Sequence, residues 1–144
     1  MRVTYAPEGG AEQVWDFDPK RVRASEAEAI ERRAGESWDA WLLNVQSGQM
    51  RARRVLLWHL MRRDHPTLRY EDTPDFFAGE VVVEHTRAEL EEIRERVVRA
   101  KLPADQREQV LSALDMAIDE AREREGGGEG EGKASSKRSA SATR

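Results

Sequence analysis

The feature that most restricts the fold of this chain is an apolar run enclosed by arginines in residues 50–63. Its apolar residues are Val55, Leu56, Leu57, Trp58, Leu60 and Met61. Arg51, Arg53 and Arg54 precede them, and Arg62 and Arg63 follow. A helix that is apolar over much of its circumference is usually central to a small core. We therefore expect a helix over about residues 50–63 that forms the centre of the core and ends before His65-Pro66.

Length and composition limit the class of protein. The 144 residues suffice for one domain, and the hydrophobic share of 38% is low, so the core should be thin. The absence of cysteine suits a reducing compartment. No apolar run approaches the roughly 18 residues of a membrane-spanning helix, and residues 1–10 lack the apolar segment of a signal peptide. We expect a soluble intracellular protein without a membrane partner.

Charge is unevenly distributed along the chain. The net charge is −4, but residues 126–144 hold four basic and two acidic residues and are therefore +2. Residues 1–125 consequently carry −6. Because nucleic-acid binding needs a basic face that neutralises phosphates, this acidic body disfavours a general nucleic-acid partner.

The N-terminal half predicts a hairpin and two helices before the arginine-rich one. β-Prone residues on both sides of Pro7–Gly10 predict a β-hairpin. These residues are Val3, Tyr5, Val14, Trp15 and Phe17. Ser25 and Glu28 have the spacing of a capping box and predict a helix to about Arg33, which Gly35 would end. Ser37 predicts the start of a second helix to about Gln46. Its apolar stripe is Trp38, Trp41, Leu42 and Val45.

The C-terminal half predicts an irregular stretch, two further helices and a tail. Residues 64–85 look irregular, although the valines at 81–83 could add a strand to the hairpin. A second capping box, from Thr86 to Glu89, predicts a helix to about Lys101. Pro103 fits the first turn of a last helix, and the two helices could form an antiparallel hairpin. The residues from Gly126 onward are mostly small or charged and predict disorder.

Together these patterns predict a mainly α (α+β) fold. An N-terminal β-hairpin would be followed by a small helical domain of about five helices. This domain would occupy residues 1–125, and a disordered tail would occupy residues 126–144.

We find no pattern that predicts catalysis or a cofactor. The three histidines, His59, His65 and His85, lack the spacing of a zinc motif. Gly126–Gly128 follows a helix, which is the wrong context for a phosphate-binding loop. Ser25 and Ser37 are better explained as helix caps than as nucleophiles. We therefore expect no catalytic residue, no metal ligand and no cofactor.

The arginines around the apolar run have two interpretations. They could contact phosphates, as in the recognition helix of a DNA-binding protein. Alternatively, they could pair with the abundant glutamates, which we favour because the body is acidic.

The aromatic residues suggest protein recognition instead. Trp38, Trp41, Trp58 and Met61 could line a groove for a partner, with Arg54 and Arg62 beside it. The alternative is that the tryptophans belong to the core, and for any single tryptophan we favour the core.

Two segments of the chain resemble a phage protein family. They are VWDFDPKRVRASEAEAIERRAGESWDAW at residues 14–41 and MRARRVLLWHLMRRDHPTLRYED at residues 50–72. They are similar to small proteins of actinobacterial tailed phages that are placed among the tail assembly chaperones. The resemblance covers residues 14–76 and extends to the general plan of a helical body with a charged C-terminus.

The resemblance implies a non-catalytic chaperone in the host cytoplasm that is absent from the finished virion. Such a chaperone binds the tape measure protein and helps to recruit tail tube subunits. Members of the family often make a longer product by −1 ribosomal frameshifting, and through it contact the tube protein. Glu131-Gly132-Lys133 is the candidate slippage position, because GGA and AAG encode Gly-Lys in lambda-like slippery sequences.

Several alternatives stay open from the sequence. The chain could be a DNA-binding regulator that uses the Arg51–Arg63 helix, or a structural head–tail adaptor that remains in the virion. Whether it forms a homo-oligomer is also open.

Overall fold

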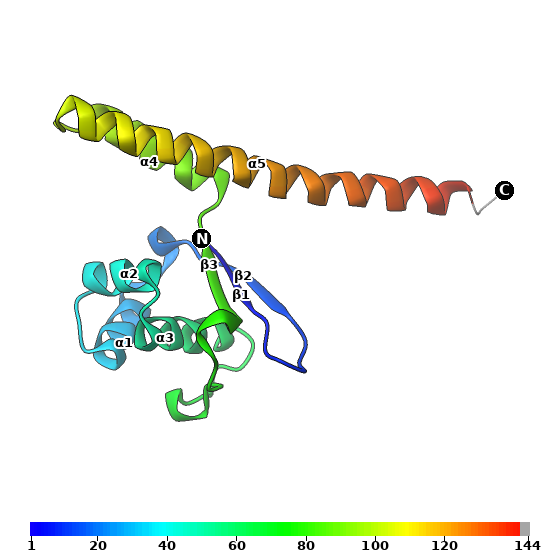
Figure 1. Ribbon diagram of the computed structural model, residues 1–144. Helices are drawn as coiled ribbons and strands as arrows, with labels where there is room; N and C mark the ends of the chain where they lie inside the picture. Colours follow the sequence, from blue (N-terminus) through cyan, green and yellow to red (C-terminus); the bar gives the residue numbers. More distant parts are fainter. Residues whose placement is uncertain (142–144) are drawn as a thin grey trace. The chain divides into compact units, whose positions relative to one another are not determined.

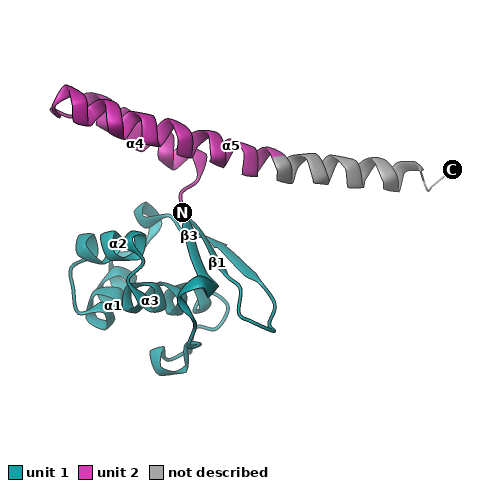
Figure 2. Ribbon diagram, in the orientation of Figure 1, with its two compact units in different colours: residues 1–84 teal, residues 85–144 magenta. Residues whose placement is uncertain are grey.

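A computed structural model describes the backbone of residues 1–141 and the side chains of residues 1–126. The chain forms two compact units, Met1–Glu84 and His85–Arg144, and Figure 2 colours them separately. The sequence analysis treated residues 1–125 as one domain, whereas the chain packs as two units that divide after Glu84. The model is mainly helical with N-terminal antiparallel strands, as the α+β expectation stated.

The first unit contains a three-stranded antiparallel sheet. Its strands are β1 (Arg2–Tyr5), β2 (Gln13–Asp16) and β3 (Val81–Glu84), in the order β2-β1-β3. The predicted hairpin is confirmed, and so is the third strand suggested by the valines. Val3 lies at the middle of the sheet, opposite both Trp15 and Val83, and is fully buried. The alternation along β1 therefore directs Val3 and Tyr5 toward the core.

Three α-helices pack with the sheet in this unit, and Figure 1 shows them beside the strands. They are α1 (Ala24–Ala34), α2 (Trp38–Ser47) and α3 (Met50–Met61). Short 3-10 helices complete the unit: η1 (Pro19–Arg21), η2 (Tyr70–Asp72) and η3 (Ala78–Glu80). The predicted central role of the arginine-flanked helix is confirmed. Six of its residues are buried: Ala52, Val55, Leu56, Leu57, Trp58 and Leu60.

Glycine and serine define the helix ends, with one exception. Gly35 and Gly48 adopt left-handed conformations, with φ of 70° and 92°, at the ends of α1 and α2. The Ser37 side chain accepts a hydrogen bond from the amide of Ala40, as predicted. The prediction for Ser25 is wrong, because α1 begins at Ala24 after Arg23, which makes no side-chain cap.

The second unit is a helical hairpin of α4 (Arg87–Arg99) and α5 (Ala104–Ser141). Thr86 caps α4 by accepting from the amide of Glu89, as the sequence predicted. The two helices run antiparallel. An early residue of α4 meets a late residue of α5 where the amide of Arg87 donates to Glu125. Further along, the Arg94 side chain donates to Asp115 at 2.7 Å.

Residues spaced alternately by three and four positions form the seam between α4 and α5. The less exposed apolar residues are Leu90, Ile93 and Val97 in α4 and Ala100 at its C-cap. In α5 they are Leu111, Leu114, Ala117, Ile118 and Ala121. The spacings of three and four residues are typical of coiled-coil packing. Among the described residues of the hairpin, Leu90, Ile118 and Ala121 form the buried core, which is small. The helix α5 continues to Ser141, and the side chains of the predicted disordered tail beyond Gly126 lie outside the described ones.

A candidate partner-binding surface beside the arginine helix

The arginines of α3 donate mainly to backbone carbonyls of other segments. Arg51 donates to the carbonyl of Arg33 at 3.0 Å, near the end of α1. Arg53 bridges the carbonyl of Val45 in α2, at 3.1 Å, and that of Val81 in β3, at 2.9 Å. The last carbonyls of a helix and the outer edge of a sheet lack partners within their own elements. The guanidinium groups supply those partners.

Two further arginines extend this pattern to loops and to the second edge of the sheet. Arg54 donates to the carbonyl of Thr73 at 2.9 Å, in the segment after η2. Arg63, two residues after α3, donates to the carbonyl of Asp16 in β2 at 3.0 Å. The helix α3 and the residues directly after it thus hold both edge strands, two helix ends and one loop by hydrogen bonds to the main chain.

This pattern corrects the favoured interpretation of the arginines. We expected them to pair with glutamates, yet none of the five forms an ion pair with a described carboxylate. Residues 40–63 contain no aspartate or glutamate, although Asp64 directly follows Arg63. Four of the five satisfy carbonyl oxygens instead.

The tryptophans of the predicted groove lie mostly in the core. Trp41 is fully buried and donates to the carbonyl of Ala52 at 3.1 Å. Trp58 is 6% exposed and donates to the carbonyl of Leu68 at 3.0 Å. Trp38 is half-buried, with its ring 5.2 Å from that of Trp41. Met61 is half-buried against the same core. The core interpretation therefore holds for Trp41 and Trp58, and no surface groove is built on them.

The structure does bring together three other predicted residues, Arg54, Trp58 and Arg62. The guanidinium carbon of Arg62 lies 4.8 Å from the centre of the Trp58 ring. That of Arg54 lies 5.0 Å from the centre of the Tyr70 ring. Trp58 and Tyr70 pack edge to face at 6.1 Å. The distances are typical of cation–π and aromatic contacts.

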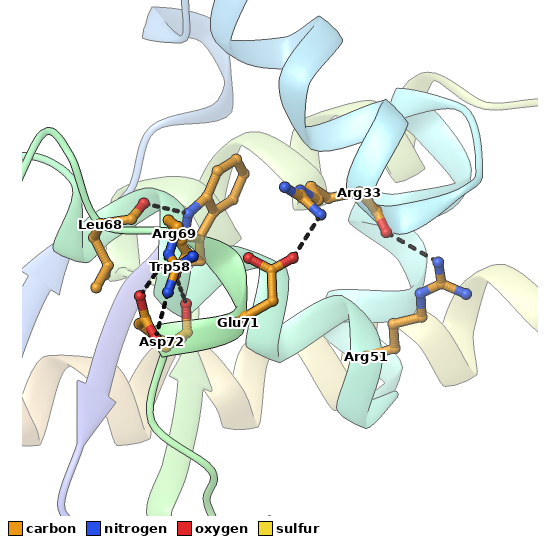
Figure 3. A network of polar contacts seen from close by, with 8 residues as sticks. Arg33, Arg51, Trp58, Leu68, Arg69, Glu71 and Asp72 are labelled. Atoms are coloured by element: carbon orange, nitrogen blue, oxygen red, sulfur yellow. Dashed lines mark hydrogen bonds and ion pairs between the residues drawn. The ribbon is translucent and has the colours of Figure 1, made fainter.

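Arg33 of α1 completes what we call the arginine–aromatic cluster: Arg33, Arg54, Trp58, Arg62 and Tyr70. Its guanidinium carbon lies 5.6 Å from the Tyr70 ring centre and 6.0 Å from that of Trp58. Figure 3 shows Arg33 directed toward Glu71, at 3.2 Å. Arg33 and Tyr70 were missed because each is far from Trp58 in the sequence, and no spacing connects them.

The cluster holds more positive than negative charge. Glu71 pairs with Arg33, while Arg69 beside it pairs with Asp72 at 2.9 Å. The hydrogen bond that Arg69 donates to the Asp72 carboxylate raises the pKa of Arg69 above its usual value. Arg62 is exposed and makes no side-chain hydrogen bond or ion pair with a described residue. The Nε of Arg54 is buried and has no hydrogen-bond partner among the described residues.

The three histidines have different surroundings. His59 is mostly buried against Phe17, with its Nε2 4.0 Å from Glu26. Burial lowers the pKa of His59, Glu26 opposes this shift, and Arg63 and Arg62 add to it. His85 contacts Glu89 at 3.1 Å, and His65 is exposed. Within residues 1–126 no three histidine, aspartate or glutamate side chains gather in a way that could hold a metal ion.

Comparisons with known proteins gave no match to a protein-family model, a curated protein or a solved structure. Among the helices that the structure describes, none combines the length and apolar character needed to cross a membrane. The candidate slippage position Glu131-Gly132-Lys133 lies outside the described side chains.

Proposed function

We propose that the chain is a non-catalytic tail assembly chaperone that binds the tape measure protein and helps to recruit tail tube subunits. The observation that carries the proposal is the resemblance of residues 14–76 to the tail assembly chaperones. Residues 14–76, which carry the resemblance, lie within the compact unit Met1–Glu84 and include the arginine–aromatic cluster. Tryptophan, tyrosine and arginine are the residue types that dominate binding energy at protein interfaces.

A pull-down tests the proposal directly. The tagged full-length chain is co-expressed with the tape measure protein from the same genome, and the captured tape measure protein is quantified. We expect capture and increased solubility of the tape measure protein. Neither effect with the tube protein also present would contradict the proposed function.

The gene order provides a second test. We expect an overlapping downstream reading frame followed by a very long tape measure gene. We also propose that the codons of Glu131-Gly132-Lys133 form a slippery heptamer that yields a longer product. Codons that cannot form such a heptamer there or nearby would contradict the frameshift but not the chaperone role.

Two alternatives predict different measurements. A head–tail adaptor would yield abundant peptides of this chain from purified virions, whereas a chaperone would not. A DNA-binding regulator would bind duplex DNA with an affinity that falls steeply with salt. We disfavour the regulator because four of the five arginines in residues 51–63 donate to the chain's own carbonyls.

A further inference from the structure

Arg62 is the most available cation of the arginine–aromatic cluster. It is exposed, and its guanidinium lies against the Trp58 ring without a hydrogen bond to a described residue. A guanidinium that stacks on an aromatic face keeps its in-plane N–H groups free for a carboxylate. The stacking also restricts the side chain, so less conformational entropy is lost when an anion binds.

The neighbouring cations strengthen this site. Arg33 is exposed and lies near both aromatic rings, and Glu71 is its only carboxylate contact among the described residues. Arg54 lies over the Tyr70 ring, and its Nε has no hydrogen-bond partner among the described residues. Three guanidinium groups therefore lie near the two rings, and one of them, that of Arg33, pairs with a carboxylate. The local excess of positive charge favours an anionic partner.

The acidic residues around the cluster indicate which kind of anionic partner can bind to it. Residues 64–75 contain four acidic residues, and residues 1–84 hold 15 acidic against 12 basic residues, a net charge of −3. An extended polyanion such as duplex DNA would meet these carboxylates beyond the cluster and be repelled. A short acidic protein segment needs only the cluster itself. Its carboxylates can accept paired hydrogen bonds from guanidinium groups, and its apolar atoms can contact the partly exposed Tyr70.

We propose that the arginine–aromatic cluster is the docking surface for an acidic segment of the tape measure protein, with Arg62 and Arg33 pairing with its carboxylates. This inference rests on the proposed function for the identity of the partner, but its chemistry can be tested separately.

The first experiment compares charge reversals in the full chain. Arg62→Glu is matched with Arg21→Glu, since Arg21 is an exposed arginine of η1 in the same unit, outside the cluster. Both variants change the net charge equally. We expect Arg62→Glu to reduce capture of the tape measure protein at least about tenfold and Arg21→Glu to leave it unchanged. Circular dichroism verifies folding, and Arg62→Gln replaces Arg62→Glu if the reversal unfolds the chain.

The outcomes separate the two proposals. Capture by the wild type that is unaffected by Arg62→Glu or Arg62→Gln would overturn the docking surface and leave the chaperone role intact. An equal loss with Arg21→Glu would show a general charge effect and would also overturn the docking surface. Failure of the wild type to capture the tape measure protein would contradict the proposed function instead.

A second experiment tests the surface without the tape measure protein. A labelled glutamate-rich peptide, its glutamine counterpart and a duplex DNA are titrated with the wild type and with Arg62→Glu. We expect binding of the glutamate-rich peptide only, weakened by salt and by Arg62→Glu. Equal binding of the glutamine peptide, no binding of the acidic peptide, or tighter Arg62-dependent binding of DNA would each overturn the proposal.

Discussion

At the scale of single residues, the arginines of α3 act through hydrogen bonds to backbone carbonyls more than through ion pairs. Arg53 is the clearest case, because one guanidinium reaches the end of α2 and the edge strand β3. A planar guanidinium carries five N–H donors on three nitrogens, so its Nε and Nη1 can each donate to an acceptor in a different element. Its contribution is structural, and it depends on carbonyls rather than on side-chain partners.

Arg53→Met is therefore expected to destabilise the first unit. The apolar stem is kept, but two carbonyls lose a charged donor, which should cost about 1.5–3 kcal/mol of unfolding free energy. Urea unfolding followed by tryptophan fluorescence measures the change. Arg23→Met is the control, since Arg23 is exposed and its side chain makes no cap. Equal stability of Arg53→Met and Arg23→Met would show that the bridge does not stabilise the fold.

His59 makes the stability of the first unit depend on pH. Burial is the main cause that lowers its pKa in the folded chain, so the unfolded chain binds the proton more readily. Stability should therefore be greatest above the ordinary pKa of about 6.5, and should fall as the pH drops from there toward the lowered folded pKa. Urea unfolding at a series of pH values measures the dependence.

The His59→Gln variant isolates this contribution from that of the carboxylates. We expect the loss of stability between neutral and mildly acidic pH to be smaller in the variant than in the wild type. Parallel pH profiles for the two proteins would contradict the assignment to His59.

At the scale of elements, the sequence predicted most helices and strands because their signals are local. Ser37 and Thr86 cap helices as predicted. Ser25 does not cap, because α1 begins one residue earlier, at Ala24, with Arg23 in the N-cap position. The arginine–aromatic cluster could not be predicted, since Arg33 and Tyr70 meet Trp58 only through tertiary packing.

The hairpin of α4 and α5 depends on few buried side chains. Leu90→Ala removes one of its three buried residues, and we expect a loss of about 2 kcal/mol or more. Far-UV circular dichroism during thermal unfolding measures the hairpin. Met116→Ala is the control, because Met116 is 65% exposed and its loss should change stability by less than about 0.5 kcal/mol. A similar effect of both substitutions would contradict the seam.

At the scale of the whole molecule, the expected single domain is replaced by two compact units. The low share of hydrophobic residues predicted a small core. The periodicity of the apolar residues could not show whether the last two helices pack against that core or against each other. Leu90 and Ile118 form a cluster separate from the core around α3. Pairing between α4 and α5 therefore accounts for apolar positions that the sequence analysis had assigned to one domain.

Residues 1–84 are accordingly expected to fold without the rest of the chain. All four tryptophans lie in this part, so fluorescence reports on it alone. We expect the isolated fragment to unfold cooperatively in urea, with a midpoint close to that of the first unit in the full chain. A fragment with solvent-exposed tryptophan emission in the absence of urea would show that the first unit requires the hairpin.

The hydrogen bonds from α3 to backbone carbonyls also affect which substitutions these contacts can tolerate. Every residue type carries a main-chain oxygen, so substitutions at Arg33, Val45, Thr73 or Val81 keep the acceptor. The donors on α3 have no such substitute, because no other side chain matches the reach and the fork of arginine. These hydrogen bonds therefore require particular side chains in one helix only, and in the segments around it they require the main chain alone.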